Sequence, residues 1–114
     1  FMVSSFQTLP HTMYLALQLI FFAVASPLLE TSMLSADAFK PEFVIISAGF
    51  DAHRDDPLAS MGLTEEGYAD LTNIVAGIAR QHCQGRLLSA LEGGYNLTAL
   101  AASVERHIQA LVAA

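Results

Sequence analysis

Charged residues are scarce in this chain of 114 residues, and its first 29 residues contain none. Asp, Glu, Lys and Arg together make up 14% of the sequence, whereas ordinary globular domains carry about a quarter. All five basic and eleven acidic residues lie from Glu30 onward. A hydrophobic content of 54% with so little charge excludes a disordered chain, because disorder requires low hydrophobicity and high net charge.

Cysteine and basic residues are also few, and each shortage excludes a class of protein. The single cysteine, Cys83, rules out a disulfide scaffold and agrees with a reducing compartment, so we expect a cytoplasmic location. A net charge of −6 disfavours a protein that binds nucleic acid through a basic surface. We therefore expect no direct binding to nucleic acid.

The uncharged, apolar run over residues 13–29 has three interpretations. An export signal would explain the small residues before Ser26, but no basic residue precedes the run. A membrane span would be at the short limit and interrupted by Gln18 and Pro27. A buried helix of a larger domain agrees best, because apolar residues recur at helical spacing around most of the circumference. We expect residues 1–38 to form a helical segment without membrane insertion, with export as the alternative.

Two short apolar runs in residues 39–114 predict buried strands. Phe43–Ala48 follows Pro41 and precedes Gly49, and Arg86–Leu91 precedes a glycine-rich turn at 92–95. Continuous β-branched and apolar runs of this length are typical of strands covered on both faces in a parallel sheet.

Helical patterns follow each predicted strand. Thr64 and Asn96 are suitable N-cap residues, and Gly85 follows the first helical pattern. The apolar positions recur every three or four residues, at Tyr68, Leu71, Val75, Ile78 and His82 in the first helix and at Leu97, Leu100, Val104, Ile108 and Leu111 in the second. The order strand, helix, strand, helix predicts an α/β fold with parallel strands and a right-handed crossover.

The predicted sheet places two chemically useful residues at one edge. Ligands of parallel sheets bind beyond the carboxyl ends of the strands. Asp51 follows the first strand and Tyr95 follows the second. A carboxylate and a phenol that converge there indicate metal or acid–base chemistry.

Two longer strings point to a family. Residues 46–58 read ISAGFDAHRDDPL and residues 91–97 read LEGGYNL, with LTEEGY at 63–68 between them. In order, spacing and context these strings closely resemble the zinc-dependent histone deacetylase superfamily, in its class II-like form with bacterial deacetylases and acetylpolyamine amidohydrolases. The resemblance runs from about Phe39 to the C-terminus. It implies an arginase-like α/β fold, a parallel sheet flanked by helices, and hydrolysis of acetyl-amide bonds in acetyl-lysine or acetylpolyamine substrates.

The resemblance also implies roles for individual residues. Asp51 matches an aspartate ligand of the family's Zn²⁺, and Tyr95 matches the tyrosine whose hydroxyl binds the substrate carbonyl and polarises it. Gly93 and Gly94 would let the backbone approach the substrate. In the family a metal-activated water attacks the acetamide carbon.

Other family residues are missing from the chain. There is no His-His pair, and Asp-x-His occurs only as Asp51-Ala52-His53, where His53 is not expected to bind zinc. Catalytic zinc sites normally use three protein ligands, and one is present. We therefore expect the C-terminal portion of a deacetylase domain, inactive alone. The alternative is a truncated module with a structural or interaction role.

Two further expectations concern the surroundings of these motifs. An unpaired sheet edge and an apolar segment cut off from its sheet predict self-association or pairing with the missing N-terminal part of the domain. The charged run at residues 54–56 predicts a solvated loop that Asp56, before Pro57, caps or braces.

Overall fold

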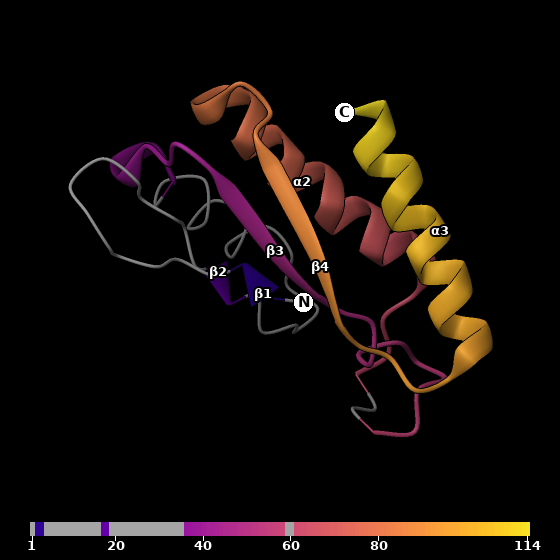
Figure 1. Ribbon diagram of the computed structural model, residues 1–114. Helices are drawn as coiled ribbons and strands as arrows, with labels where there is room; N and C mark the ends of the chain where they lie inside the picture. The colour runs from indigo at the N-terminus through magenta and orange to yellow at the C-terminus, as the bar shows by residue number, and fades with distance from the viewer. Residues whose placement is uncertain (1, 4–16, 19–35, 59–60) are drawn as a thin grey trace.

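The computed structural model describes residues 2–3, 17–18, 36–58 and 61–114 (Figure 1). Its elements are strands β1 (Met2–Val3), β2 (Leu17–Gln18), β3 (Val44–Gly49) and β4 (Leu87–Gly93), and helices α2 (Glu65–Cys83) and α3 (Leu97–Ala113). A single helical turn covers residues 36–39. In this described part of the chain, no helix is both long and apolar enough to cross a membrane.

The sheet has the order β2-β1-β3-β4, and its two long strands are parallel. The pairing of β3 with β4 begins at Val44 opposite Leu87, which confirms the predicted parallel α/β unit. Strands β1 and β2 add antiparallel neighbours that the sequence patterns did not indicate. Leu17–Gln18 is a strand, so the helix predicted across residues 13–29 is wrong at these two positions. The remainder of that predicted helix lies outside the described residues.

A β-bulge separates the ends of the two parallel strands. Ala48 pairs with Leu91 but Gly49 pairs with Gly93, so β4 carries one extra residue, Glu92. The backbone N–H of Phe50 then donates to the Gly93 carbonyl at 2.7 Å. Strand β4 therefore ends at Gly93, two residues beyond the predicted end at Leu91. Of the turn predicted over residues 92–95, the first two residues belong to the strand.

Helix α2 covers β3 as its pattern predicted. The Thr64 side chain accepts a hydrogen bond from the Gly67 N–H at 3.2 Å, which confirms the N-cap. Glu65 and Glu66 lie in the first turn, where the helix dipole favours negative charge. Four of the five predicted core positions are buried: Tyr68, Leu71, Val75 and Ile78. Together with the inward side chains of β3 they form the core.

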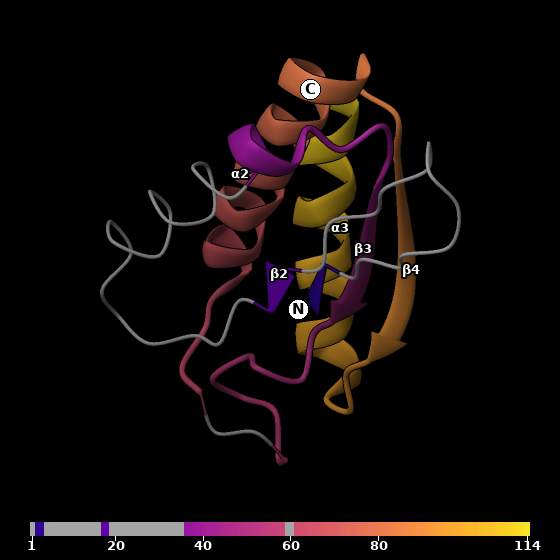
Figure 2. The ribbon, with the colours of Figure 1, turned by 90° about the vertical axis from the view of Figure 1, so that its left-hand side faces the viewer.

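Helix α3 begins at the predicted cap, Asn96, but buries a different face from the predicted one. Its buried residues are Ala99, Ser103, His107 and Ala110, whereas Leu97 is 78% exposed and Ile108 is 51% exposed. Small side chains let α3 lie close to α2, and both helices lie on the same side of the β3–β4 pair (Figure 2). Of the predicted stripe, Leu100 and Val104 are partly buried against the core, whereas Leu97 and Ile108 are exposed.

A buried histidine joins the two helices to β4. His107 Nδ1 lies 2.6 Å from Thr72 Oγ1, and its Nε2 lies 2.8 Å from Ser89 Oγ. Thr72 Oγ1 already donates to the Tyr68 carbonyl at 2.6 Å, so it accepts from Nδ1–H. Nε2 then accepts from the Ser89 hydroxyl. This network uses the neutral imidazole, and burial lowers the pKa of His107.

We expect the stability of the fold to fall on acidification through His107. Because its pKa is lower in the folded chain than in the unfolded one, the unfolded chain binds the proton more readily. The contribution of neutral His107 to the free energy of unfolding is complete above its ordinary pKa of 6.5. It is lost as the pH falls through the lower pKa that His107 has in the folded chain. Urea unfolding at pH 7.5 and 5.5 measures this loss. His107→Asn is expected to show a smaller pH dependence, and an equal dependence in both proteins would contradict the assignment.

Candidate active site

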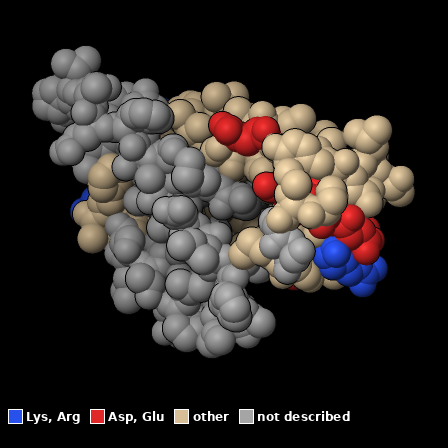
Figure 3. Space-filling model, turned by 90° about the horizontal axis from the view of Figure 1, so that it is seen from below, with Lys and Arg blue, Asp and Glu red and all other residues tan. Residues whose placement is uncertain are grey.

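The two predicted site residues leave the sheet at matching positions. Strand β3 ends at Gly49 and β4 ends at Gly93, so Asp51 and Tyr95 each lie two residues beyond a strand end. Figure 3 views this end of the molecule from below and shows several acidic patches, with a basic patch beside one of them. The carboxyl edge of the parallel pair is therefore formed by the two loops that carry Asp51 and Tyr95.

Gly93 shows how close Asp51 and Tyr95 lie. A methyl carbon placed on the Cα of Gly93 would be 3.5 Å from the Tyr95 hydroxyl oxygen and 3.8 Å from the Asp51 carboxyl carbon. Both functional groups thus border the space above the bare Gly93 backbone. The Tyr95 residue is 56% exposed, so a small molecule can reach it from solvent. The sequence predicted that Asp51 and Tyr95 lie at the same edge of the sheet, and in the structure both side chains lie next to Gly93.

A buried aromatic pair, Phe50 and Tyr68, lies close enough to Asp51 to feel its charge. Tyr68 is fully buried, and its ring lies 4.9 Å from that of Phe50, centre to centre. Burial raises the pKa of Tyr68 far above its ordinary value, and the negative charge of Asp51 raises this pKa further. The Tyr68 phenol therefore stays neutral beside the Asp51 carboxylate.

His53 is a structural residue of the loop after β3. It is fully buried, and its Nδ1 accepts the backbone N–H of Asp55 at 3.1 Å. The ring proton of the neutral form is therefore on Nε2, which faces Glu65 Oε1 at 3.3 Å. The histidine therefore joins this loop to the first turn of α2.

Asp56 ties the two loops together. It is 5% exposed, and its Oδ2 accepts the backbone N–H groups of Tyr95 at 2.7 Å and Asn96 at 3.3 Å. Its Oδ1 accepts the Leu58 N–H at 2.9 Å. Burial opposes ionisation, but these three bonds outweigh that effect and lower the pKa of Asp56. The predicted brace is confirmed and reaches further than predicted, because it also holds the loop of Tyr95.

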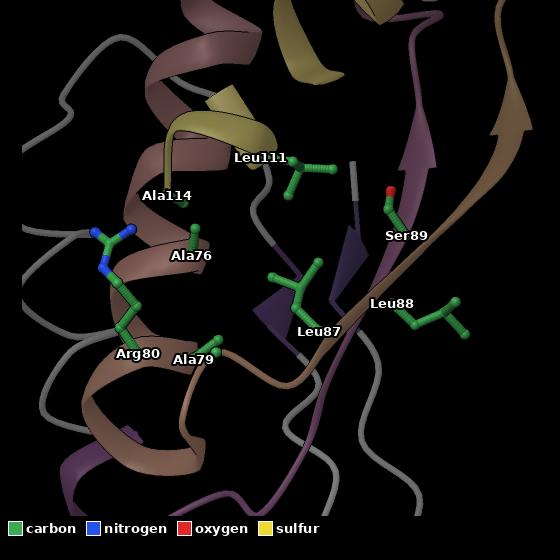
Figure 4. Close-up of a pocket in the computed structure, with 9 residues that line it drawn as sticks. Ala76, Ala79, Arg80, Leu87, Leu88, Ser89, Leu111 and Ala114 are labelled. Carbon is green, nitrogen blue, oxygen red and sulfur yellow. The ribbon is translucent and has the colours of Figure 1, made fainter. Parts of the chain in front are cut away.

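A groove on the described surface lies away from this edge. A groove of about 350 Å³ runs between α2, α3 and β4, and Figure 4 shows Leu87 and Leu111 pointing into it while Arg80 points away. Its other lining residues are Ala76, Ala79, Gly85, Leu88, Ser89 and Ala114. Apolar side chains dominate this groove and it holds no carboxylate, so we place the chemistry at the carboxyl edge instead.

Comparison with known proteins identifies the family to which this chain belongs. The family model for the histone deacetylase domain matches residues 21–111. The chain belongs to the histone deacetylase family. It is 48% identical over 73 residues to the type-2 histone deacetylase 1 of Dictyostelium discoideum, covering 64% of this chain and 5% of the relative. The polyamine deacetylase HDAC10 of Mus musculus is 43% identical over 74 residues, covering 65% of this chain and 10% of that protein.

The deacetylase fold is also found in solved structures similar to this chain. The crystal structure of the HDA15 HD domain aligns with a TM-score of 0.62 and 44% identity, covering 71% of this chain and 22% of the other. The chain therefore spans only a small part of the deacetylases it matches. The α/β, arginase-like fold that the sequence strings implied is confirmed for this part.

A deacetylase metal centre is not complete among the described residues. The carboxylate of Asp51 suits Zn²⁺, but no group of three His, Cys, Asp or Glu side chains that could hold a metal occurs in residues 36–58 and 61–114. His53, the nearest histidine in sequence, directs Nδ1 to the Asp55 N–H of its own loop and Nε2 to Glu65 at the start of α2. These residues by themselves do not fit a catalytic zinc ion.

Gly94 has a backbone conformation that favours glycine. Its φ is 144°, a region that side chains disfavour. A Cβ at this position would lie 2.8 Å from Leu100 Cδ1 and 3.2 Å from Phe50 Cβ. The glycine therefore lets the loop after β4 pass between β3 and α3 on its way to Tyr95.

We expect Gly94→Ala to destabilise the fold by more than about 1 kcal/mol, because it adds both backbone strain and a steric clash. Gly62→Ala is the matched control, since Gly62 also has a positive φ (73°) but no atom would lie within 4 Å of its Cβ. Denaturant unfolding of both variants measures the difference. Equal losses would show that the contact with Leu100 and Phe50 is unimportant.

Proposed function

We propose that these 114 residues supply the C-terminal part of a zinc-dependent deacetylase that hydrolyses acetyl-amide bonds. The observation that carries the proposal is the meeting of Asp51 and Tyr95 over the bare backbone of Gly93. A carboxylate and a phenol that border one open space are suited to hold a metal and a carbonyl oxygen side by side. Membership of the histone deacetylase family supports this assignment.

Tyr95 has the position and chemistry to bind the substrate carbonyl. Its phenol is exposed, and a hydroxyl donates a hydrogen bond to an oxygen that gains negative charge during attack on the amide. Gly93 presents no side chain between Tyr95 and Asp51, so an acetyl group can enter there. Gly94 sets the path of the loop that carries the phenol.

Asp51 would contribute one of three expected protein ligands to Zn²⁺, which in such sites lowers the pKa of a bound water. The other ligands, and the general base, must come from residues beyond those described. The substrate class is an acetylated amine, either acetyl-lysine or an acetylpolyamine. The names of the relatives support both, since they include histone deacetylases and a polyamine deacetylase.

The second candidate is a truncated deacetylase module with a structural or interaction role. The single potential zinc ligand among the described site residues favours this alternative for the chain on its own. The two candidates differ in whether the natural gene product that carries these residues also supplies a His-His pair and a further Asp-x-His.

We expect the purified 114-residue chain to show no deacetylase activity with added Zn²⁺ on an acetyl-lysine peptide or an acetylpolyamine, because one ligand does not hold a catalytic zinc ion. The natural gene product carrying these residues is expected to be active and inhibited by a chelator. In it, Tyr95→Phe should lower kcat roughly 100-fold, through loss of one hydrogen bond to the developing oxyanion.

Chelator-sensitive turnover by the 114-residue chain alone would overturn the incomplete-site interpretation. An inactive gene product with both histidine motifs present would overturn the deacetylase proposal. A gene product without these motifs would support the structural module.

We also propose that a further strand covers the free edge of β4. Among the described strands β4 pairs only with β3, and Leu88 and Leu91 are more than half exposed. The Arg86 carbonyl accepts from Val44 N–H, so by alternation the backbone groups of Leu87, Ser89 and Leu91 point away from β3. In the gene product the missing part of the domain would pair there, and in the isolated chain a second copy would.

The isolated chain is therefore expected to form dimers or larger species, measured by light scattering during gel filtration. Leu91→Lys should shift it toward the monomer, because a lysine on an edge strand opposes strand pairing. Leu97→Lys on α3 is the control, since Leu97 is even more exposed than Leu91 but lies off the edge. A stable wild-type monomer would contradict the proposal.

A further inference from the structure

We infer that Asp56 is a positioning residue, which sets the place of the Tyr95 hydroxyl relative to Asp51 by clamping the loops after β3 and β4 together. The inference rests on the proposed function, in which Tyr95 and Asp51 act on the same acetyl group. The carboxylate of Asp56 binds the backbone amides of Tyr95 and Asn96, and it can do so without touching substrate.

The carboxylate of Asp56 is suited to this role because each oxygen serves a different loop. Oδ1 accepts from Leu58 N–H, two residues further along its own loop. Oδ2 accepts from the Tyr95 and Asn96 amides, 39 and 40 residues away in sequence. The contact of 2.7 Å to the Tyr95 N–H is short, as expected for a charged acceptor.

A second bond runs between the same two loops in the opposite direction. The Asn96 side-chain amide donates to the Asp55 carbonyl at 3.0 Å, while its oxygen caps α3 through the Ala99 N–H at 3.1 Å. The start of α3 is thus joined to the loop that carries Asp51. Because Tyr95 directly precedes Asn96, its backbone is held both by its own bond to Asp56 and by the bond from the Asn96 side chain to Asp55.

Neighbouring charged side chains do not take over the role of Asp56 as acceptor for the Tyr95 and Asn96 amides. His53, whose ring lies in the same loop, adds only a weaker favourable charge effect after the backbone bonds. Arg54 faces Asp55, with its Nε 4.0 Å from Asp55 Oδ2. The backbone N–H groups of Tyr95 and Asn96 therefore depend on Asp56 for their acceptor, and loss of this carboxylate would free the turn that aims Tyr95.

A misplaced phenol should lower the rate more than it lowers substrate binding. A displacement of about 1 Å in a group that acts on the transition state costs on the order of 100-fold in rate. We therefore expect Asp56→Asn to lower kcat roughly 10- to 100-fold with KM changed less. Asp55→Asn is the matched control, because the neighbouring Asp55 side chain is 63% exposed and accepts neither amide.

A double-mutant cycle in the natural gene product tests whether Asp56 acts through Tyr95. If it does, Asp56→Asn should cost little further kcat in the Tyr95→Phe background. In the 114-residue chain, hydrogen exchange of the Tyr95 and Asn96 amides should accelerate at least about tenfold in Asp56→Asn, and the nuclear Overhauser contact between the Tyr95 ring and a Gly93 Hα should weaken. Asp55→Asn should leave both unchanged. If Asp56→Asn does not fold, Asp56→Glu, which keeps the charge on a longer side chain, replaces it.

Two results would overturn the inference: unchanged exchange and unchanged Tyr95–Gly93 contact in Asp56→Asn, or an equal loss of kcat with and without the Tyr95 hydroxyl. An inactive wild-type gene product would instead overturn the proposed function. In that case the exchange rates and the Tyr95–Gly93 contact still decide whether Asp56 positions Tyr95.

Discussion

The parallel pairing of β3 with β4 is the constraint on which the site depends. Parallel strands end at the same edge, so two loops that are about 40 residues apart in sequence meet there. The bulge at Glu92 adjusts the ends of the two strands, and the bond from Phe50 to Gly93 closes the pair. Asp51 and Tyr95 come together because each lies two residues beyond the end of its strand.

Much of this arrangement was predictable from local sequence signals. The strands are continuous apolar runs, and Thr64 and Asn96 are polar caps at the correct distance from the helices they begin. These signals depend on neighbouring residues only. The resemblance to deacetylases then supplied the roles of Asp51 and Tyr95, which periodicity alone had limited to metal or acid–base chemistry.

The face of α3 was not predictable in the same way. Apolar periodicity selects the largest hydrophobic side chains, yet α3 packs on α2 through alanines, Ser103 and a hydrogen-bonded His107. The polar partners of His107 come from α2 and β4, so the sequence around it carries no signal of its burial. Asp56 was partly predictable, because Asp before Pro is typical of a turn, but its bonds to the other loop depend on tertiary structure.

The clamp between the two loops also limits how the length of the chain can change. An inserted residue between Asp51 and Asp56 would shift the carboxylate away from the Tyr95 amide, and one between Gly93 and Asn96 would shift the amide instead. Met61 and Gly62 are exposed, and a side chain at Gly62 would meet no atom within 4 Å. Insertions, deletions and engineered tags should therefore be tolerated there and rejected within the clamped segments.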